Sequence, residues 1–221
     1  TGYRRQRQMC IRDSLDIEFK VIEIEEIVNI FRNTLKESVN DELGPITDEN
    51  IQSRVRGNIL MALSNQTGAM VVSTGNKSEM AVGYSTLYGD LAGGFALLKD
   101  LYKTEVYNLA NFRNSISSVI PQNTIDKEPS AELRPDQFDK DSLPEYELLD
   151  EILRMYIEED SSSEKIISKG IDENIVYDVL SKVDRNEYKR KQVAPGVKLT
   201  EKAFGKDRRM PITNTYIRER G

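Results

Sequence analysis

The chain has 221 residues, enough for one complete hydrophobic core with some extension. Its 31 basic and 37 acidic side chains give a net charge of −6, which argues against a general nucleic-acid-binding protein. One cysteine and no histidine exclude a disulfide framework, an imidazole zinc site and catalysis by a Ser-His or Cys-His pair. No apolar run approaches eighteen residues, so we expect no membrane span. Any chemistry must therefore depend on carboxylates, amines, guanidiniums, hydroxyls, backbone groups and a hard metal ion.

The chain starts with an arginine-rich segment, residues 1–14, which contrasts with the acidic sequence that follows. No apolar run follows these charges, so the segment is not a secretory signal. We expect residues 1–14 to be a non-native leader and residues 15–221 to form the domain. Residues 15–24 alternate and are rich in Ile, Val and Phe, which predicts a strand.

Two helices are predicted next. Residues 25–39 have apolar side chains at helical spacing, and Gly44–Thr47 reads as a turn with Thr47 capping a helix over about 48–65. On this second helix one face opposes an apolar stripe that we expect to face the core. The first face consists of Asn50, Arg54, Gly57 and Met61, and the stripe of Ile51, Val55, Ile59, Ala62 and Leu63.

Residues 70–79 predict a short buried strand (70–73), a tight turn and the start of a helix. Asn76 stands at the helix N-cap, with Glu79 three residues later, which is the pattern of a capping box. A strand, turn and helix N-terminus also present backbone N–H groups to a phosphate. The residues alone leave both interpretations open.

Further helices are predicted over 104–113, 145–158, 163–168 and 172–183, the second with an apolar stripe of Leu149, Ile152, Leu153 and Tyr156. From Ala194 onward, proline and glycine indicate an extended tail packed on the rest of the chain. Residues 126–160 are strongly acidic and residues 182–221 strongly basic, and solvated faces explain either block. The order of elements predicts an α/β fold, a Rossmann-like parallel sheet flanked by helices, with a helical C-terminal extension.

Eight blocks of sequence, in order and spanning almost the whole chain from Leu15, resemble the synthetase domain of glutamine-dependent NAD synthetase. They are residues 50–58 (NIQSRVRGN), 74–79 (TGNKSE), 88–95 (YGDLAGGF), 99–104 (KDLYKT), 129–135 (PSAELRP), 141–144 (DSLP), 184–190 (DRNEYKR) and 204–214 (FGKDRRMPITN). The resemblance implies a fold of the adenine nucleotide α-hydrolase type. The family's Ser-Gly-Gly-x-Asp-Ser pyrophosphate loop and its N-terminal glutaminase domain have no counterpart here, and residues 1–14 match nothing in the family. We therefore expect an N-terminally truncated domain without its first strands and phosphate loop.

The resemblance implies ATP-dependent amidation of deamido-NAD to NAD through an acyl-adenylate, with ATP as substrate and Mg²⁺ as the metal. Ammonia would come from glutamine through a glutaminase domain. The resemblance also implies a cytoplasmic enzyme and a homo-oligomer. This reaction needs no protein nucleophile, so the lack of His and reactive Cys is no obstacle.

Site residues follow from the same resemblance. Those implied to bind deamido-NAD are Asn50, Arg54, Glu79 and Lys189, with Gly57 giving clearance; those implied to bind ATP are Thr74, Lys103 and Ser130. Glu79 would also bind magnesium. Leu87 and Gly94 stand where the ammonia-dependent branch has a lysine and an aspartate, a pattern that looks like the glutamine-dependent branch.

Each of these residues also has a purely structural interpretation. Arg54 would be a solvated helix charge, Lys103 a helix-start charge, Ser130 a turn residue, and Lys189 part of a basic tail facing an acidic block. Two other functions remain open: a related amidating ATP-pyrophosphatase with another acceptor, such as GMP synthetase, or a non-catalytic fragment that serves only in assembly. The phosphate loop missing from the sequence is the main support for the last.

Overall fold

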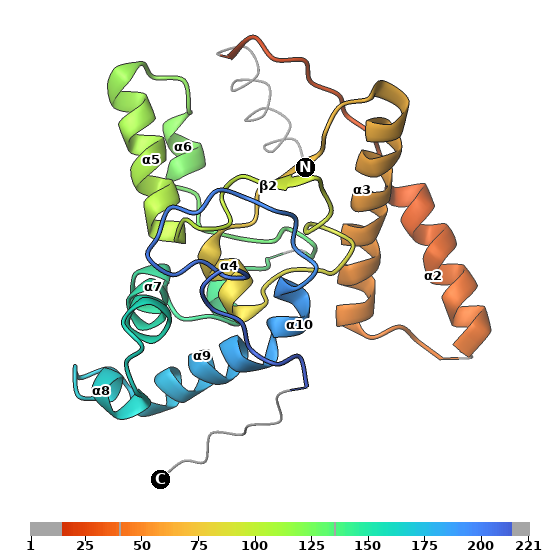
Figure 1. Cartoon of the computed structure of the whole chain (residues 1–221). Coiled ribbons are helices and arrows are strands. Elements are labelled where there is room, and N and C mark those ends of the chain that lie inside the picture. Colours follow the sequence, from red (N-terminus) through yellow and green to blue (C-terminus); the bar gives the residue numbers. More distant parts are fainter. Residues whose placement is uncertain (1–14, 40, 135, 214–221) are drawn as a thin grey trace.

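The computed structural model describes residues 15–39, 41–134 and 136–213 (Figure 1). Its sheet has two parallel strands, β1 (Val72–Ser73) and β2 (Phe95–Ala96), with Val72 opposite Phe95. Helices surround this sheet, with α3 on one side of it and α5 on the other in Figure 1. The predicted parallel pairing and flanking helices are confirmed for this part of the chain. The strand predicted over 70–73 is shorter than expected, because only its last two residues pair, and Val72 is exposed.

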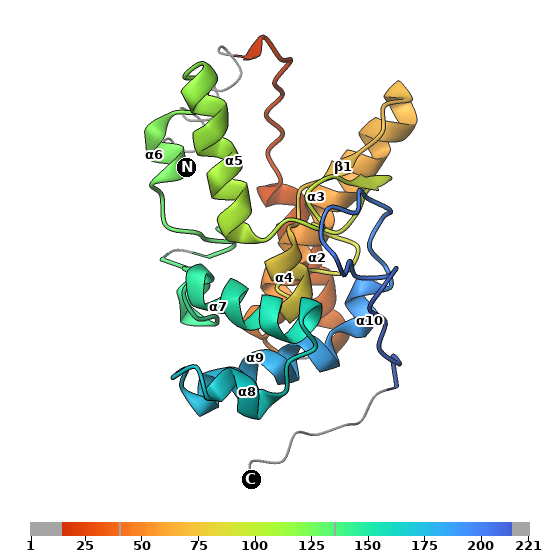
Figure 2. The same ribbon diagram turned by 60° about the vertical axis from the view of Figure 1, so that its left-hand side comes forward.

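The strand predicted over residues 15–24 is wrong. Residues 17–24 carry no regular secondary structure, and in Figure 2 they rise away from the body of the protein. Alternating side chains give a segment one apolar face, but a strand also needs a neighbour for its backbone N–H and C=O groups. Within the described residues the two paired strands are β1 and β2, so this segment has no place in the sheet.

The two helices that follow pack against each other. Helix α2 (Glu25–Val39) has the predicted bounds, and α3 (Pro45–Thr67) starts earlier than predicted. Thr47 is therefore not the cap: Gly44 takes the N-cap position and Pro45 the first helical position, where its fixed φ suits a helix and its missing N–H costs nothing. Val28, Ile51 and Val55 form a small core between the helices. Contrary to the predicted stripe, Ala62 is exposed.

Two helices begin just after the strands. Helix α4 (Lys77–Val82) follows β1 and is mostly buried. Helix α5 (Lys103–Ile116) follows β2 and contains the predicted helix 104–113. The short α6 (Gln122–Ile125) comes next. Because β1 and β2 are parallel, α4 and α5 both start on the side of the sheet where the strands have their carboxyl ends.

The C-terminal half of the chain supplies most of the side chains of the main hydrophobic core. It contains a 3₁₀ turn (Asp139–Asp141), α7 (Tyr146–Leu153), η2 (Arg154–Glu158), α8 (Ser163–Ile167), α9 (Glu173–Arg185) and α10 (Glu187–Arg190). This confirms the helical extension. The helix predicted over 145–158 exists, but its last five residues, η2, are π-helical. Its four stripe residues are buried in the core as predicted.

The predicted extended tail lies across β2. The Ala96 N–H donates to the Pro195 carbonyl at 2.9 Å. Gly196 packs so closely that a Cβ there would lie 2.2 Å from the Ala96 carbonyl oxygen, which only glycine allows.

None of the helices in the described part of the chain is long and apolar enough to cross a membrane.

Candidate functional site

The turn between β1 and α4 forms the predicted capping box. The Glu79 N–H donates to Asn76 Oδ1 at 3.0 Å, and the Asn76 N–H donates to Glu79 Oε2 at 3.2 Å. Thr74 lies exposed at the start of this turn. The box fixes the direction in which α4 leaves the sheet, and it leaves the other oxygen of Glu79 for a second partner.

That second partner is Lys103, the first residue of α5. Its Nζ donates to Glu79 Oε1 at 3.1 Å, with both side chains about one-fifth exposed. The ring centroid of Tyr146 is 5.2 Å from this ammonium and that of Tyr107 is 6.0 Å away. Burial lowers the pKa of Lys103, but the negative charge and hydrogen bond of Glu79 outweigh it, so the pKa is raised and the amine stays charged. A carboxylate and an ammonium therefore meet beyond the carboxyl ends of two parallel strands.

Ser130 does not contact this ion pair directly, and only a series of contacts connects them. Its hydroxyl donates to the Gln137 carbonyl and accepts from the Glu132 N–H at 3.0 Å, as a turn residue does. Two hydrogen bonds connect this turn to Tyr146, whose ring lies beside Lys103. The Asp139 N–H donates to the Pro129 carbonyl at 3.0 Å, and Tyr146 Oη donates to Asp139 Oδ2 at 2.7 Å.

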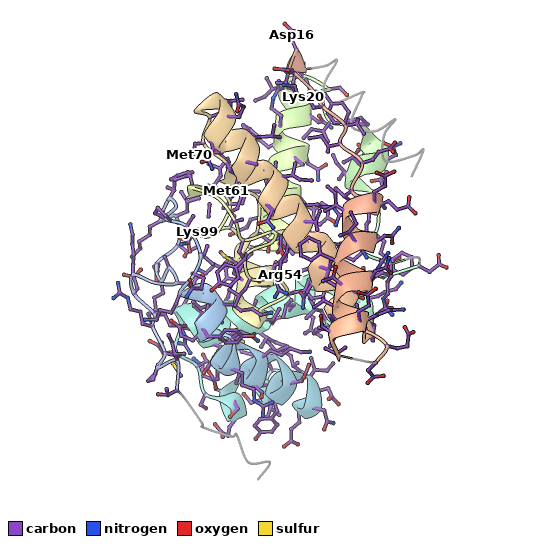
Figure 3. The ribbon with its side chains drawn as sticks, turned by 90° about the vertical axis from the view of Figure 1, so that its right-hand side faces the viewer. Asp16, Lys20, Arg54, Met61, Met70 and Lys99 are labelled. Carbon is purple, nitrogen blue, oxygen red and sulfur yellow. The ribbon has the colours of Figure 1, made fainter. Side chains whose placement is uncertain are left out.

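Three residues implied to bind the dinucleotide all hold one loop, residues 83–90. Asn50 Oδ1 accepts from Thr86 Oγ1 at 2.8 Å. Arg54 Nε donates to the Leu87 carbonyl at 3.2 Å, and its side chain is otherwise exposed on α3 (Figure 3).

Lys189 Nζ donates to the same loop, to the carbonyls of Gly83 at 2.6 Å and Ser85 at 2.8 Å. Burial lowers the pKa of Lys189, and the nearby charge of Asp90 opposes that shift. The structure thus divides the four residues implied to bind deamido-NAD: Glu79 pairs with Lys103, and the other three contact loop 83–90.

The expected clearance at Gly57 needs correction. A Cβ there would lie 2.8 Å from the Tyr88 carbonyl oxygen, so the missing side chain makes room for the backbone of loop 83–90. Beside this contact is a pocket of about 300 Å³ whose lining includes Met61, Leu91 and Gln192. At Gly57, this face of α3 is therefore covered by loop 83–90.

The residues of the described ranges do not by themselves make a magnesium site. Both oxygens of Glu79 already accept hydrogen bonds, and no group of three or more potential ligands among His, Cys, Asp and Glu occurs in the part of the chain that the structure describes. Magnesium in proteins often takes one or two carboxylates and completes its shell with phosphate oxygens and water. Glu79 as such a carboxylate therefore stays a prediction.

Two residues at this site were missed by the sequence reasoning, Ser78 and Asp150. The Lys103 N–H donates to Ser78 Oγ at 2.9 Å, and the Thr104 N–H donates to Asp150 Oδ2 at 2.9 Å. Ser78 stands inside one of the eight blocks, next to Glu79. Asp150 lies in the acidic segment, and no local pattern distinguishes it from the solvated carboxylates around it.

Two parallel strands, followed by a turn with Thr74 and by helix starts with Glu79 and Lys103, form an arrangement typical of α/β nucleotide-binding domains. The profile of the NAD synthase family matches residues 4–193, so the chain belongs to this family. The match begins inside the segment expected to be a leader, whose residues lie outside the described ranges.

Known relatives agree with this assignment. The chain is 52% identical over 209 residues to a glutamine-dependent NAD(+) synthetase of Aquifex aeolicus, covering 95% of this chain and 37% of the relative. Among solved structures it resembles the glutamine-dependent NAD+ synthetase of Acinetobacter baumannii in complex with ADP, with 45% identity, a TM-score of 0.55, and coverage of 97% and 39%. It also resembles the NMN synthetase of Francisella tularensis, with 25% identity, a TM-score of 0.71, and coverage of 90% and 73%. The chain thus spans well under half the length of the glutamine-dependent relatives.

Proposed function

We propose that this chain is the ligase part of an enzyme that forms NAD from deamido-NAD, ATP and ammonia. The observation that carries the proposal is the meeting of Glu79 and Lys103, 3.1 Å apart, where α4 and α5 begin beyond the carboxyl ends of β1 and β2. Open α/β sheets bind nucleotides at this edge. The family match and the ADP in one similar solved structure support the same assignment.

In the proposed reaction, a carboxylate oxygen of the nicotinate ring attacks the α-phosphorus of ATP and the bond to pyrophosphate breaks. Ammonia then attacks the carbonyl carbon of the acyl-adenylate, loses a proton, and AMP leaves with the electron pair of the broken bond. Thr74, Lys103 and Ser130 are proposed to contact ATP, where the Lys103 ammonium would offset phosphate charge. Asn50, Arg54, Glu79 and Lys189 are proposed to hold deamido-NAD, and Glu79 is proposed as the magnesium ligand.

The remaining partners are also proposals. Ammonia is proposed to come from a glutaminase domain, as the glutamine-dependent relatives suggest, and the enzyme is proposed to be a cytoplasmic homo-oligomer. The likeness to an NMN synthetase favours one specific alternative, a mononucleotide acceptor in place of the dinucleotide.

The test compares two proteins: the chain from Leu15, and the same chain with a family segment carrying the Ser-Gly-Gly-x-Asp-Ser loop restored before it. Both receive ATP, magnesium and ammonium, with deamido-NAD, nicotinate mononucleotide or xanthylate as acceptor. Formation of amide and pyrophosphate is measured. Only the restored protein should turn over, because removing even one donor to a developing anion costs about a hundredfold or more.

Each outcome bears on the proposal. A clear preference of the restored protein for deamido-NAD supports it, and preference for the mononucleotide or xanthylate replaces the acceptor. No turnover with any acceptor would favour the non-catalytic fragment. Comparable turnover by the short chain would show that the loop is dispensable.

A further inference from the structure

The carboxylate of Asp150, on α7, lies between the first turns of α4 and α5. Its Oδ1 accepts from Ser78 Oγ, and its Oδ2 accepts from the Thr104 N–H at 2.9 Å. The side chain is 2% exposed. Burial raises its pKa, while the hydrogen bonds from Ser78 and Thr104 oppose that shift. A carboxylate in such a buried place is costly unless its oxygens are well bonded, and here both are.

These bonds join the two helix starts. The Ser78 hydroxyl donates to Asp150 and at the same time accepts from the Lys103 N–H at 2.9 Å. Ser78 and Asp150 therefore satisfy the first two amides of α5, which have no partner within that helix. A further backbone bond runs from the Lys77 N–H to the Leu101 carbonyl at 2.7 Å.

The Glu79–Lys103 ion pair lies next in the chain to the residues that these hydrogen bonds hold. Glu79 follows Ser78 in the chain, and Lys103 precedes Thr104, so each member of the pair is one residue from a group that Asp150 holds. The relative position of α4 and α5 therefore bears directly on the 3.1 Å contact between Lys103 Nζ and Glu79 Oε1.

We propose that Asp150 is a positioning residue that acts through Ser78 and the first amides of α5 to fix the Glu79 carboxylate against the Lys103 ammonium. The geometric part of this inference is independent of any reaction. Its consequence for catalysis rests on the proposed function, because it assumes that Lys103 contacts ATP. The simpler interpretation is that Asp150 is only a well-bonded core carboxylate that stabilises the fold.

A triple-mutant cycle on the full chain separates these interpretations. The coupling between Glu79 and Lys103 is measured from urea unfolding of E79Q, K103M and the double variant, first with Asp150 and then with Asp150→Asn. Asparagine keeps one acceptor oxygen for the Thr104 N–H and turns its NH₂ group toward Ser78 Oγ, so the Ser78 hydroxyl no longer donates to residue 150 and the negative charge is lost. We expect the coupling to change the unfolding equilibrium constant by about fivefold with Asp150, and hardly at all in the D150N background.

A matched control is Asp184→Asn. Asp184 lies on α9, is 3% exposed and accepts from Tyr156 Oη at 2.6 Å, a bond that joins α9 to η2. This variant should lower overall stability and leave the coupling unchanged. Should D150N fail to fold, the same cycle is run with Ser78→Ala, which removes the acceptor of the Lys103 N–H. Coupling that survives in D150N, or in S78A where that variant replaces it, overturns the proposal.

The kinetic arm uses the restored enzyme described above. There D150N should raise the KM for ATP by roughly tenfold and, because Glu79 is proposed to contact deamido-NAD, should raise the KM for deamido-NAD as well. On a K103A background it should have no further effect on the KM for ATP. Loss of coupling with an unchanged KM for ATP would leave the positioning role intact and reject the role proposed for Lys103. Equal effects on both substrates, with the coupling intact, would show a structural role only and overturn the proposal.

Discussion

Lys77 Nζ lies 3.2 Å from Asp100 Oδ1, and neither side chain reaches solvent. The same ammonium donates to Glu158 Oε1 at 2.9 Å and to Thr200 Oγ1 at 2.5 Å, and it sits 4.8 Å from the ring centroid of Tyr102. Asp100 Oδ2 in turn accepts from the N–H groups of Leu199 and Thr200, both at 2.7 Å. One buried lysine thus connects α4, the segment after β2, the end of η2 and the tail.

Replacing Lys77 by methionine should therefore destabilise the fold strongly. The carboxylates of Asp100 and Glu158 would then lose the positive charge that balances them. Removing one partner of a buried ion pair typically costs about 3–5 kcal/mol in the free energy of unfolding. Urea unfolding measures this, and Lys165→Met on the exposed side of α8 is the control, with an expected change within about 0.5 kcal/mol. A loss in K77M as small as in the control would mean that the tail is held mainly by Asp100.

Sequence patterns predicted those features of the fold that depend on residues close to one another in the chain. The helix of residues 25–39, the Asn76–Glu79 capping box and the buried stripe of the helix over 145–158 are predictable, because each depends on residues only a few positions apart. The strand over 15–24 failed because its alternation says nothing about a partner. The cap at Thr47 failed because Pro45 starts the helix three residues earlier than predicted, with Gly44 as the cap.

Contacts between distant segments were not predictable in the same way. The two ion pairs Lys77–Asp100 and Glu79–Lys103 each join residues more than twenty positions apart, and nothing in the spacing records which charged side chains meet. The resemblance identified Glu79 and Lys103 separately, as contacts to different ligands. Only the folded chain shows that they contact each other.

Glu79→Gln tests the proposed magnesium ligand. The Gln oxygen still accepts from the Asn76 N–H, so the capping box survives while the negative charge is lost. In the restored enzyme, turnover should fall at least roughly tenfold and the magnesium concentration needed for half-maximal rate should rise. Unchanged magnesium dependence would reject the assignment and leave Glu79 as a cap and the partner of Lys103.

Arg54→Ala tests recognition of deamido-NAD. An arginine that holds a charged, desolvated ligand typically contributes about 2–5 kcal/mol, so deamido-NAD should bind far more weakly while ATP affinity is nearly unchanged. The guanidinium donates to the Leu87 carbonyl from an exposed position on α3, so the fold should tolerate the change. Calorimetric titration of each ligand provides the measurement, with Arg113→Ala on α5 as control. Equal weakening of ATP would show that this face of α3 is misassigned.

The pair of Arg32 with Asp48, which ties α2 to α3, should make stability depend on pH. The guanidinium nitrogens Nε and Nη2 both donate to the Asp48 carboxylate, the second at 2.8 Å. The hydrogen bond from Arg32 lowers the pKa of Asp48, against the opposing effect of burial. Because the folded pKa lies below the unfolded value of about 3.9, the stabilisation is fully present above that pH and is lost as the pH falls through the folded pKa.

Asp48→Asn should accordingly lower the free energy of unfolding at neutral pH by up to about 1 kcal/mol, since each side chain is about one-third exposed and solvent weakens the pair. The difference from the wild type should shrink steadily below about pH 4, where the wild type loses the same interaction. Urea unfolding across this range measures it, and Glu37→Gln on the exposed face of α2 should show no such trend. A difference that stays constant down to about pH 2 would mean that the new amide disturbs the packing of α2 on α3 and that the charge contributes nothing.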